Sequence, residues 1–172
     1  MNLKIVIANR RDAEALAKIL SGAVRYKMEH GDGAWGDTPY TRQEAERLIG
    51  GARVYLAYQN EELVGTFSLQ DKDVRVWGAT RESAIYLHRL AVSQGAHGRH
   101  IGEQLLSCAA RETANMGYSL LRLDCDERNT SLRSYYEQHG FKMVGRRQPT
   151  AADHYVAALY EQRIAPNVYT PR

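Results

Sequence analysis

The chain has 172 residues, 44% of them hydrophobic and 25% charged, and a formal net charge of +3. This length and composition suit one globular domain with a full core. No stretch reaches the ~18 continuous apolar residues that cross a bilayer, and the start MNLKIVIANRRD is too briefly apolar for a secretory signal, so we expect a cytoplasmic protein without a membrane partner. The positive charges are dispersed, which gives little support for a nucleic-acid partner, and a polyanionic small molecule explains them as well.

The first half of the chain begins with a predicted strand and helix. Leu3, Ile5 and Ile7 alternate with polar or smaller residues, as in a strand. A helix follows from about Asp12, which we expect to be its N-cap. The apolar positions of this helix recur at helical spacing and are Ala13, Leu16, Ala17, Leu20 and Val24.

Residues 31–41 predict a turn-rich loop that contains Trp35 and several acidic side chains. Thr41 and Glu44 have the spacing of a capping box for a short second helix. Residues 54–59 and 63–70 predict two strands, and the short separation between them favours an antiparallel hairpin. Residues 71–83 predict a loop with a strand extension.

The second half is organised around a strand, a loop and a helix. Residues 84–92 predict a strand with Tyr86, His88, Leu90 and Val92 on one face, and residues 93–100 predict a loop. A helix then runs from Ile101 to near residue 117. Residues 120–125 predict a strand parallel to 84–92, because a helix connects the two. A further helix, capped by residue 129 or 130, ends at residue 140, and residues 141–145 and 155–160 predict the last strands.

A loop that leads into a helix is suited to bind an anion. The first amides of a helix are unpaired, and its N-terminus carries partial positive charge. Gly95, Gly98 and Gly102 do not have the spacing of a Rossmann loop, and the chain lacks the Lys-Ser or Lys-Thr pair of a P-loop. An ordinary surface loop with turn glycines is the alternative.

The loop resembles the acyl-CoA-binding motif of the GNAT superfamily of N-acetyltransferases, [RQ]-x-x-G-x-[GA]. The matching residues are His97, Gly98, Arg99, His100, Ile101 and Gly102. His97 replaces the usual Arg or Gln, and His100 replaces the usual central Gly. A second block resembles the later GNAT motif, with Asn129, Tyr136, Gly140 and Phe141 in the expected order.

This resemblance implies an α/β (α+β) fold: a single mixed, mostly antiparallel, twisted sheet flanked by helices, with a parallel splayed strand pair at the cofactor site. The resemblance covers nearly the whole chain. We therefore expect one acetyltransferase domain over residues 1–165 and a C-terminal tail over residues 166–172.

The resemblance also implies which residues bind acetyl-CoA. Leu90, Ala91 and Val92 would pair with the pantetheine arm through main-chain hydrogen bonds, and an amide near Val92 would stabilise the oxyanion. The amides from His97 to Gly102 would hold the pyrophosphate. Asn129 would belong to the cofactor site. Tyr136 would protonate the departing thiolate, and its neighbour Tyr135 would not.

The general base and the acceptor site are less defined by the sequence. Histidine has an unperturbed pKa of ~6.5, which suits a base at neutral pH, and His88 would share with Tyr86 the face turned toward the acceptor. A hydrogen-bonded structural histidine is an alternative, as is Asp124 acting through water. Trp35, with the carboxylates of its loop, would suit a cationic amine, although solvated loop residues are the alternative.

The predicted function is N-acetyl transfer from acetyl-CoA, a co-substrate, directly to a primary amine of a small molecule or a peptide or protein. The alternative on the same fold is a non-catalytic acyl-CoA-binding module. We expect no metal, because His97 and His100 lack a third ligand. Cys125 as an acyl-carrying nucleophile is disfavoured, since the sequence identifies no base beside it. Exposed sheet edges are compatible with a homodimer.

Overall fold

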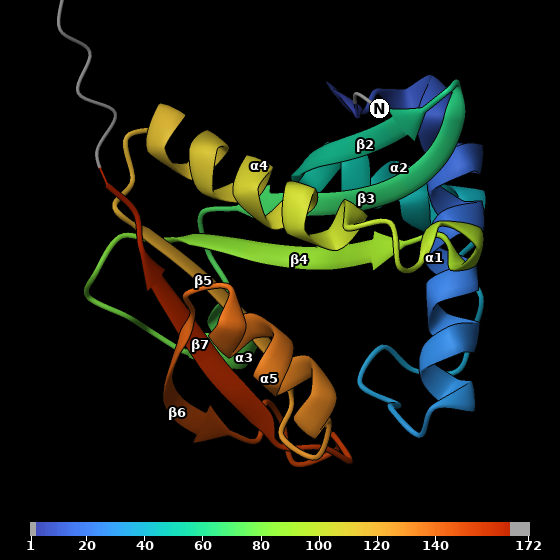
Figure 1. Cartoon of the computed structure of the whole chain (residues 1–172). Helices are drawn as coiled ribbons and strands as arrows, with labels where there is room; N and C mark the ends of the chain where they lie inside the picture. The colour runs from blue at the N-terminus through green and yellow to red at the C-terminus, as the bar shows by residue number, and fades with distance from the viewer. Residues whose placement is uncertain (1–2, 166–172) are drawn as a thin grey trace, which may run out of the picture. The chain divides into compact units, whose positions relative to one another are not determined.

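The computed structural model describes residues 3–165, so the expected tail, residues 166–172, lies outside the described residues. Figure 1 shows the elements. The strands are β1 (Lys4–Ile7), β2 (Arg53–Gln59), β3 (Glu62–Gln70), β4 (Ile85–Val92), β5 (Leu120–Asp126), β6 (Lys142–Arg147) and β7 (Ala157–Arg163). The helices are α1 (Ala13–Glu29), α2 (Arg42–Gly51), α3 (Val74–Trp77), α4 (Ile101–Asn115) and α5 (Thr130–Gln138), with short 3-10 helices η1 (Arg10–Asp12) and η2 (Gln94–Ala96).

The strands form a seven-stranded mixed sheet in the order β1-β2-β3-β4-β5-β7-β6. β4 and β5 are parallel, and Ile85 pairs with Leu121 and Tyr86 with Arg122. The pairs β1–β2, β2–β3, β5–β7 and β6–β7 are antiparallel. A mixed, mostly antiparallel sheet with one parallel pair was predicted and is confirmed.

The chain forms two compact units, which we describe separately. The first consists of residues up to Gln70 together with Leu87–Leu105, and the second of Asp71–Tyr86 and the residues from Leu106 onward. β4 and α4 therefore each contribute residues to both units. Among residues 3–165, no helix is both long enough and apolar enough to cross a membrane.

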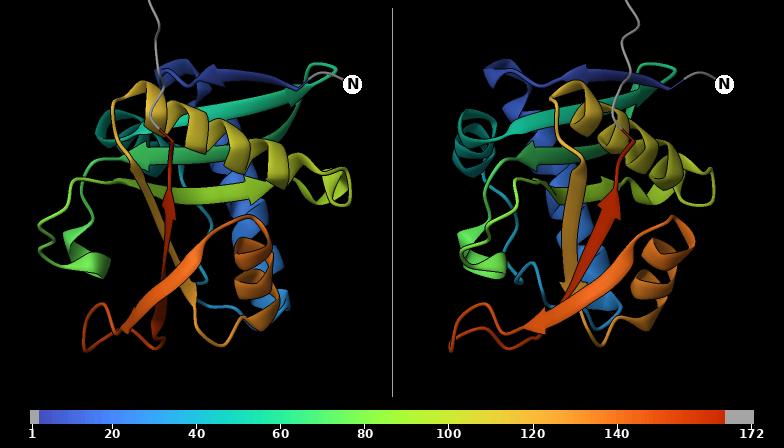
Figure 2. Two further views of the ribbon diagram at one scale, coloured as in Figure 1. Left: turned by 60° about the vertical axis from the view of Figure 1, so that its left-hand side comes forward. Right: turned by 90° about the vertical axis from the view of Figure 1, so that its left-hand side faces the viewer.

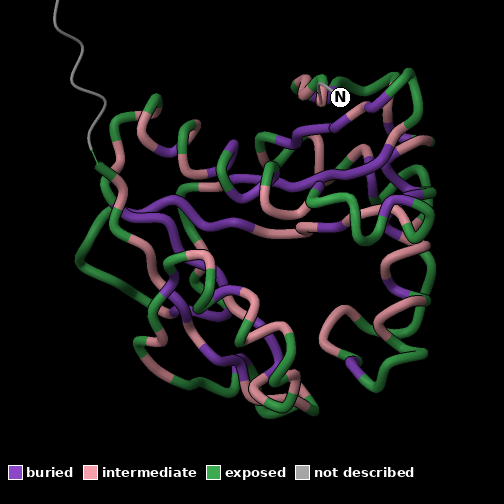
Figure 3. The backbone as a smooth tube through the Cα atoms, in the orientation of Figure 1, coloured by how far each residue is buried: buried purple, intermediate pink, exposed green. Residues whose placement is uncertain are grey.

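In the first unit, α1 and α2 bury their apolar faces against β2. β2 and β3 are buried over most of their length (Figure 3). The predicted apolar stripe of α1 is confirmed, because all five of its residues are buried. The predicted capping box of α2 is also present, with Thr41 and Glu44 each bonded to the other's backbone amide.

One cap in this unit differs from the prediction. Asp12 makes no side-chain cap hydrogen bond to α1. Its carboxylate accepts the Asn9 amide at 2.8 Å, and the Asn9 side chain accepts the Arg11 amide at 3.0 Å. The helical segment therefore begins earlier than expected, through η1, because Asn9 is an effective cap three residues before Asp12.

In the second unit, β5, β7 and β6 lie side by side, and α5 runs beside them (Figure 2). A buried cluster joins α3 to the strands; it consists of Val76, Trp77, Ala84, Tyr86, Leu120 and Ala157. The loop expected for residues 71–83 is present, but its strand extension is wrong, since Val74–Trp77 form α3. Asp73 caps that helix by accepting the Val76 amide at 3.1 Å, which favours a helical turn over an extended chain.

We predict that Gly65→Ala destabilises the protein by about 1–3 kcal/mol. A Cβ at Gly65 would lie 2.8 Å from Leu105 Cδ1, 3.3 Å from Ile101 Cγ2 and 3.4 Å from the Ala91 carbonyl oxygen. Leu105 is fully buried and has little room to move. Urea unfolding measures the change. Gly22→Ala is the control, because Gly22 lies in α1 with nothing within 4 Å of its added Cβ, and we expect it to stabilise the helix. Equal midpoints for Gly65→Ala and wild type would contradict the prediction.

Candidate functional site

β4 carries an irregularity at Arg89, where φ is 53°. A left-handed backbone is costly for a residue with a Cβ, and it interrupts the alternation of faces that the sequence predicted for residues 84–92. Beyond Arg89, the strand continues through Leu90, Ala91 and Val92. β4 is held against β3 by a hydrogen bond from the Ser93 amide to the Val64 carbonyl at 2.9 Å.

The loop after β4 contains η2 and then two left-handed residues. Gly98 has φ 76° and His100 has φ 57°. Glycine adopts such a conformation freely, whereas His100 does so at a cost. The backbone here therefore keeps the shape that suits a glycine, which gives a physical reason for the central Gly of the motif that this loop resembles.

Both histidines of the loop are held by neighbouring groups of the first unit. His97 Nε2 lies 3.1 Å from the Val92 carbonyl oxygen, and its ring meets that of Tyr26 edge to face, with centroids 4.8 Å apart. His100 Nδ1 lies 2.8 Å from Glu103 Oε1. This hydrogen bond and the charge of Glu103 raise the pKa of His100.

The amides of the loop are not all available to an anion. The His97 amide donates to the Gln94 carbonyl at 3.3 Å, and the Arg99 amide donates to the Ala96 carbonyl at 3.4 Å. Both hydrogen bonds are long. Among residues 3–165, the amides of Gly98, His100, Ile101 and Gly102 at the start of α4 have no backbone acceptor. The guanidinium of Arg99, an exposed residue, reaches Gln59 Oε1 at 3.5 Å.

In the second unit, Asn129 caps α5, because its Oδ1 accepts the Leu132 amide at 3.0 Å. Tyr136, on the same helix, is 6% exposed. Its ring centroid lies 5.9 Å from that of Phe141 and 6.2 Å from that of Tyr160. The second motif thus folds into one capped helix whose inner face carries Tyr136.

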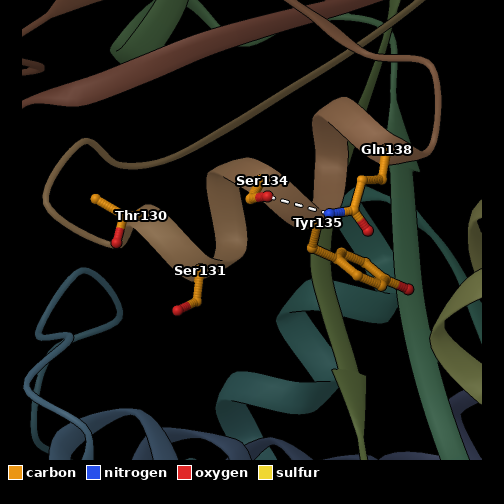
Figure 4. Close-up of a pocket in the computed structure, with 5 residues that line it drawn as sticks. All are labelled: Thr130, Ser131, Ser134, Tyr135 and Gln138. Carbon is orange, nitrogen blue, oxygen red and sulfur yellow. Dashed lines mark hydrogen bonds between the residues drawn. The ribbon is translucent and has the colours of Figure 1, made fainter.

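Tyr135 has a different environment from Tyr136. It lines a shallow pocket on α5 together with Thr130, Ser131, Ser134 and Gln138 (Figure 4). Its ring centroid lies 4.4 Å from that of His139. The two adjacent tyrosines are therefore distinguishable by burial as well as by their position in the motif.

The hydroxyl of Tyr86 belongs to a network around Arg122 in the second unit. Arg122 Nη1 donates to Tyr86 Oη at 3.2 Å, and the same oxygen lies 3.1 Å from Thr80 Oγ1. Arg122 is 5% exposed. It also donates to Glu161 at 2.9 Å and to Glu82 at 3.2 Å. The sequence prediction did not include Arg122 among the site residues. Its position between the apolar residues of a predicted strand nevertheless indicated a buried charge that requires hydrogen-bond acceptors.

Asp124 also lies in the second unit, half-buried on β5 and opposite Leu159 of β7. The hydroxyl of Tyr155 interacts electrostatically with the Asp124 carboxylate. Burial, followed by the charge of Asp124, raises the pKa of Tyr155. A carboxylate in this position can attract a cation or accept a proton through water.

The loop of residues 31–41, in the first unit, is attached to α1 rather than freely solvated. Asp32 is 4% exposed and pairs with Lys27 at 2.5 Å. Lys27 Nζ also lies 5.3 Å from the Trp35 ring centroid, and the Arg89 guanidinium carbon lies 5.2 Å from it. Trp35 therefore already has two protein cations against it, which makes the surroundings of this ring unfavourable for a cationic substrate.

His88 is half-buried on β4, and its carbonyl oxygen accepts the Ser68 hydroxyl at 3.2 Å. Cys108 and Cys125 are buried, and neither forms a disulfide within residues 3–165. Burial raises the pKa of the Cys108 thiol. A buried thiol with a raised pKa is a poor nucleophile.

The chain matches known acetyltransferases in sequence. A model of the "Acetyltransferase (GNAT) family" matches residues 16–141. A curated protein of Bacillus subtilis (strain 168), "Uncharacterized N-acetyltransferase YesJ", is 28% identical over 142 residues, which is 78% of this chain and 78% of the relative.

Solved structures show the same fold. A GNAT-family acetyltransferase from Listeria monocytogenes 4b F2365 has a TM-score of 0.76 at 23% identity, over 94% of this chain and 95% of that one. YncA from Salmonella typhimurium, a "putative acetyltransferase" solved with its cofactor acetyl-CoA, has a TM-score of 0.73 at 17% identity, over 98% of this chain and 99% of that one. Since the family model covers most of the sequence, from α1 to the end of α5, this chain belongs to the GNAT family of acetyltransferases.

Proposed function

We propose that the protein transfers an acetyl group from acetyl-CoA directly to a primary amine of a small molecule or of a peptide or protein. The observation that carries this proposal is the junction of β4 and α4, where left-handed Gly98 and His100 leave several amides for a diphosphate. The acetyl-CoA bound to YncA supports the same cofactor here. A catalytic role is favoured over an acyl-CoA-binding module because both Asn129 and Tyr136 of the second motif are present.

The family model includes residues of both compact units. We therefore propose that residues 1–165 act as one acetyltransferase domain. Each motif is complete within its own unit, the phosphate loop in the first and α5 in the second.

The reaction needs three contributions from the chain. The main chain from Leu90 to Val92 would pair with the pantetheine arm, and an amide near Val92 would donate to the oxyanion. The phenol of Tyr136 would protonate the CoA thiolate as it leaves. An alkylamine has a pKa of ~10 and is mostly ammonium at neutral pH, so His88, or Asp124 acting through water, would take up its proton.

A screen of amines with acetyl-CoA, read by release of free thiol, tests the function. We predict that Tyr136→Phe lowers kcat by about 100-fold, the scale of general acid catalysis, because the phenyl ring keeps the packing against Phe141 and Tyr160 and only the hydroxyl is lost. Tyr135→Phe is the matched control and is expected to retain activity. Loss of activity confined to Tyr135→Phe would overturn the assignment. Acetyl-CoA binding without thiol release for any amine would favour the non-catalytic module.

For the base, we predict that His88→Ala lowers kcat below about pH 8 by on the order of 100-fold, while the Kd for acetyl-CoA changes little. The difference from wild type should narrow at higher pH, where more of the acceptor is already the free amine. Rate measurements from pH 6 to 10 and calorimetric titration with CoA provide the two readouts. Equal losses of rate and of CoA affinity at all pH values would exclude a base role.

For the cofactor loop, we predict that His100→Gly binds acetyl-CoA more tightly, by about three- to tenfold, a gain of roughly 1 kcal/mol. Glycine removes the Cβ at the point proposed to approach the diphosphate most closely, whereas relief of the left-handed strain should raise the stability of the protein. His100→Ala separates the two side-chain effects, because it loses the imidazole but keeps the Cβ and the strain. Weaker binding by both variants, most pronounced at low pH, would instead indicate that the protonated imidazole contacts the phosphates.

A further inference from the structure

Arg89 combines a strained backbone with a guanidinium that has no acceptor. Its φ of 53° lies in the left-handed region, and its side chain is half-buried. Within residues 3–165, no hydrogen bond or ion pair is found for this side chain, whose contacts are with aromatic rings. Backbone strain of this kind persists only where the surrounding structure imposes it, and it is concentrated at functional sites.

Two aromatic rings hold the guanidinium in place. The guanidinium carbon lies 5.2 Å from the Trp35 ring centroid and 5.8 Å from the Tyr40 ring centroid. The loop that carries both rings is fixed to α1, since the Tyr40 amide donates to Ser21 Oγ at 2.9 Å and Ser21 Oγ donates to the Tyr40 carbonyl at 3.3 Å. Arg89 is therefore preorganised, and a ligand would meet a guanidinium whose position is already set.

Asp32 and Glu44, two acidic residues of this unit, have other partners. Asp32 pairs with Lys27 and accepts the Ala34 amide at 3.1 Å. Glu44 accepts the amide and the hydroxyl of Thr41, both at 2.7 Å. Lys27 and Asp32 compensate each other's charge, whereas no carboxylate among residues 3–165 forms an ion pair with Arg89, so the uncompensated charge beside Trp35 is the positive charge of Arg89.

We propose that Arg89 binds an anionic oxygen group, a carboxylate or a phosphate, carried by the acceptor amine. This inference rests on the proposed function and specifies its substrate class. The guanidinium presents a planar set of donors that matches either anion in a two-point hydrogen bond. Arg89 immediately precedes Leu90–Val92, the segment proposed to pair with the pantetheine arm, so the same strand would contact both substrates.

The inferred acceptor differs from the cationic amine that the acidic loop suggested. Its amino group is acetylated, and its anionic group is what the enzyme recognises. A loop with Asp32 neutralised by Lys27, and with two cations against Trp35, favours a zwitterionic substrate over a polyamine.

Matched pairs of acceptors test this inference. Amino acids are compared with their amides for the carboxylate, and phosphoethanolamine with ethanolamine for the phosphate, each with acetyl-CoA and thiol detection. We expect wild type to favour the anionic member of one pair by at least about tenfold in kcat/KM. Equal kcat/KM for the two members of both pairs would overturn the inference.

Variants at Arg89 assign that preference to its side chain. Arg89→Gly should raise KM for the anionic acceptor at least about tenfold and leave KM for acetyl-CoA within about twofold. The ratio of kcat/KM between the two members of the acceptor pair should then be close to one. Arg89→Lys keeps the positive charge but loses the planar guanidinium, so its KM for the anionic acceptor should lie between those of wild type and Arg89→Gly. Glycine also relieves the left-handed strain, so the thermal midpoint of Arg89→Gly should not fall. An unchanged acceptor ratio in a folded Arg89→Gly protein would contradict the role.

A binding assay separates this inference from the proposed function. Trp77→Phe leaves Trp35, beside Arg89, as the single tryptophan. Its fluorescence should respond saturably to an anionic acceptor without acetyl-CoA, and not to the matched amide or to ethanolamine, and Arg89→Gly should abolish the response. Such a response with no thiol release would support the anion site while the transferase proposal fails. Thiol release without any anion-dependent response would overturn the anion site alone.

Discussion

The loop proposed to bind the diphosphate, residues 97–102, depends on how closely β3 approaches the first turn of α4. Gly65 leaves no room for a Cβ beneath Ile101 and Leu105, both of which are buried. The Ser93 amide, bonded to the Val64 carbonyl, holds the end of β4 to the same strand. The start of the helix is thus fixed relative to the strand before it, and the direction of the first helical amides is fixed as well. An anion site built from backbone amides needs amides of fixed direction, because a backbone amide cannot rotate toward a ligand as a side chain can.

Left-handed residues give this region its shape, and they do so at unequal cost. Gly98 adopts its φ freely, whereas His100 and Arg89 adopt theirs against the steric preference of a residue with a Cβ. At His100 the backbone has a left-handed conformation that suits glycine, but the side chain is an imidazole. The departure from the motif is therefore a change of side chain, and we expect its consequence in the affinity for the cofactor rather than in the fold.

Two arginines, buried Arg122 and half-buried Arg89, differ in how their hydrogen-bonding capacity is used. Arg122 donates to Glu161, Glu82 and Tyr86 and lies over the Trp77 ring. Its hydrogen-bonding capacity is used within the second unit, which makes it a packing and positioning group. Arg89 has aromatic contacts but no acceptor among the described residues, so an anionic ligand would complete its surroundings.

Much of the fold could be predicted because its signals are local. The stripe of α1, the Thr41 and Glu44 capping box, the β2–β3 hairpin and the ends of α4 and α5 depend on residues within a few positions of one another. The order of strand, helix and strand also determined that β4 and β5 are parallel, since a helical crossover leaves few other arrangements. The family motifs likewise lie in short continuous segments, which is why the sequence alone could indicate the family and suggest residues 97–102 and Tyr136 as site residues.

What the sequence by itself determined was therefore the order of elements, the family and the motif on which the proposed cofactor loop rests. Only the tertiary structure revealed that Asp32 is buried against Lys27, that the Tyr86 hydroxyl is bound to Arg122, and that Arg89 is left-handed against Trp35. These features depend on contacts between residues far apart in the chain. The alternation and spacing of residues do not show which charged side chains form hydrogen bonds or ion pairs. The packing of segments that are far apart in the chain decides those contacts.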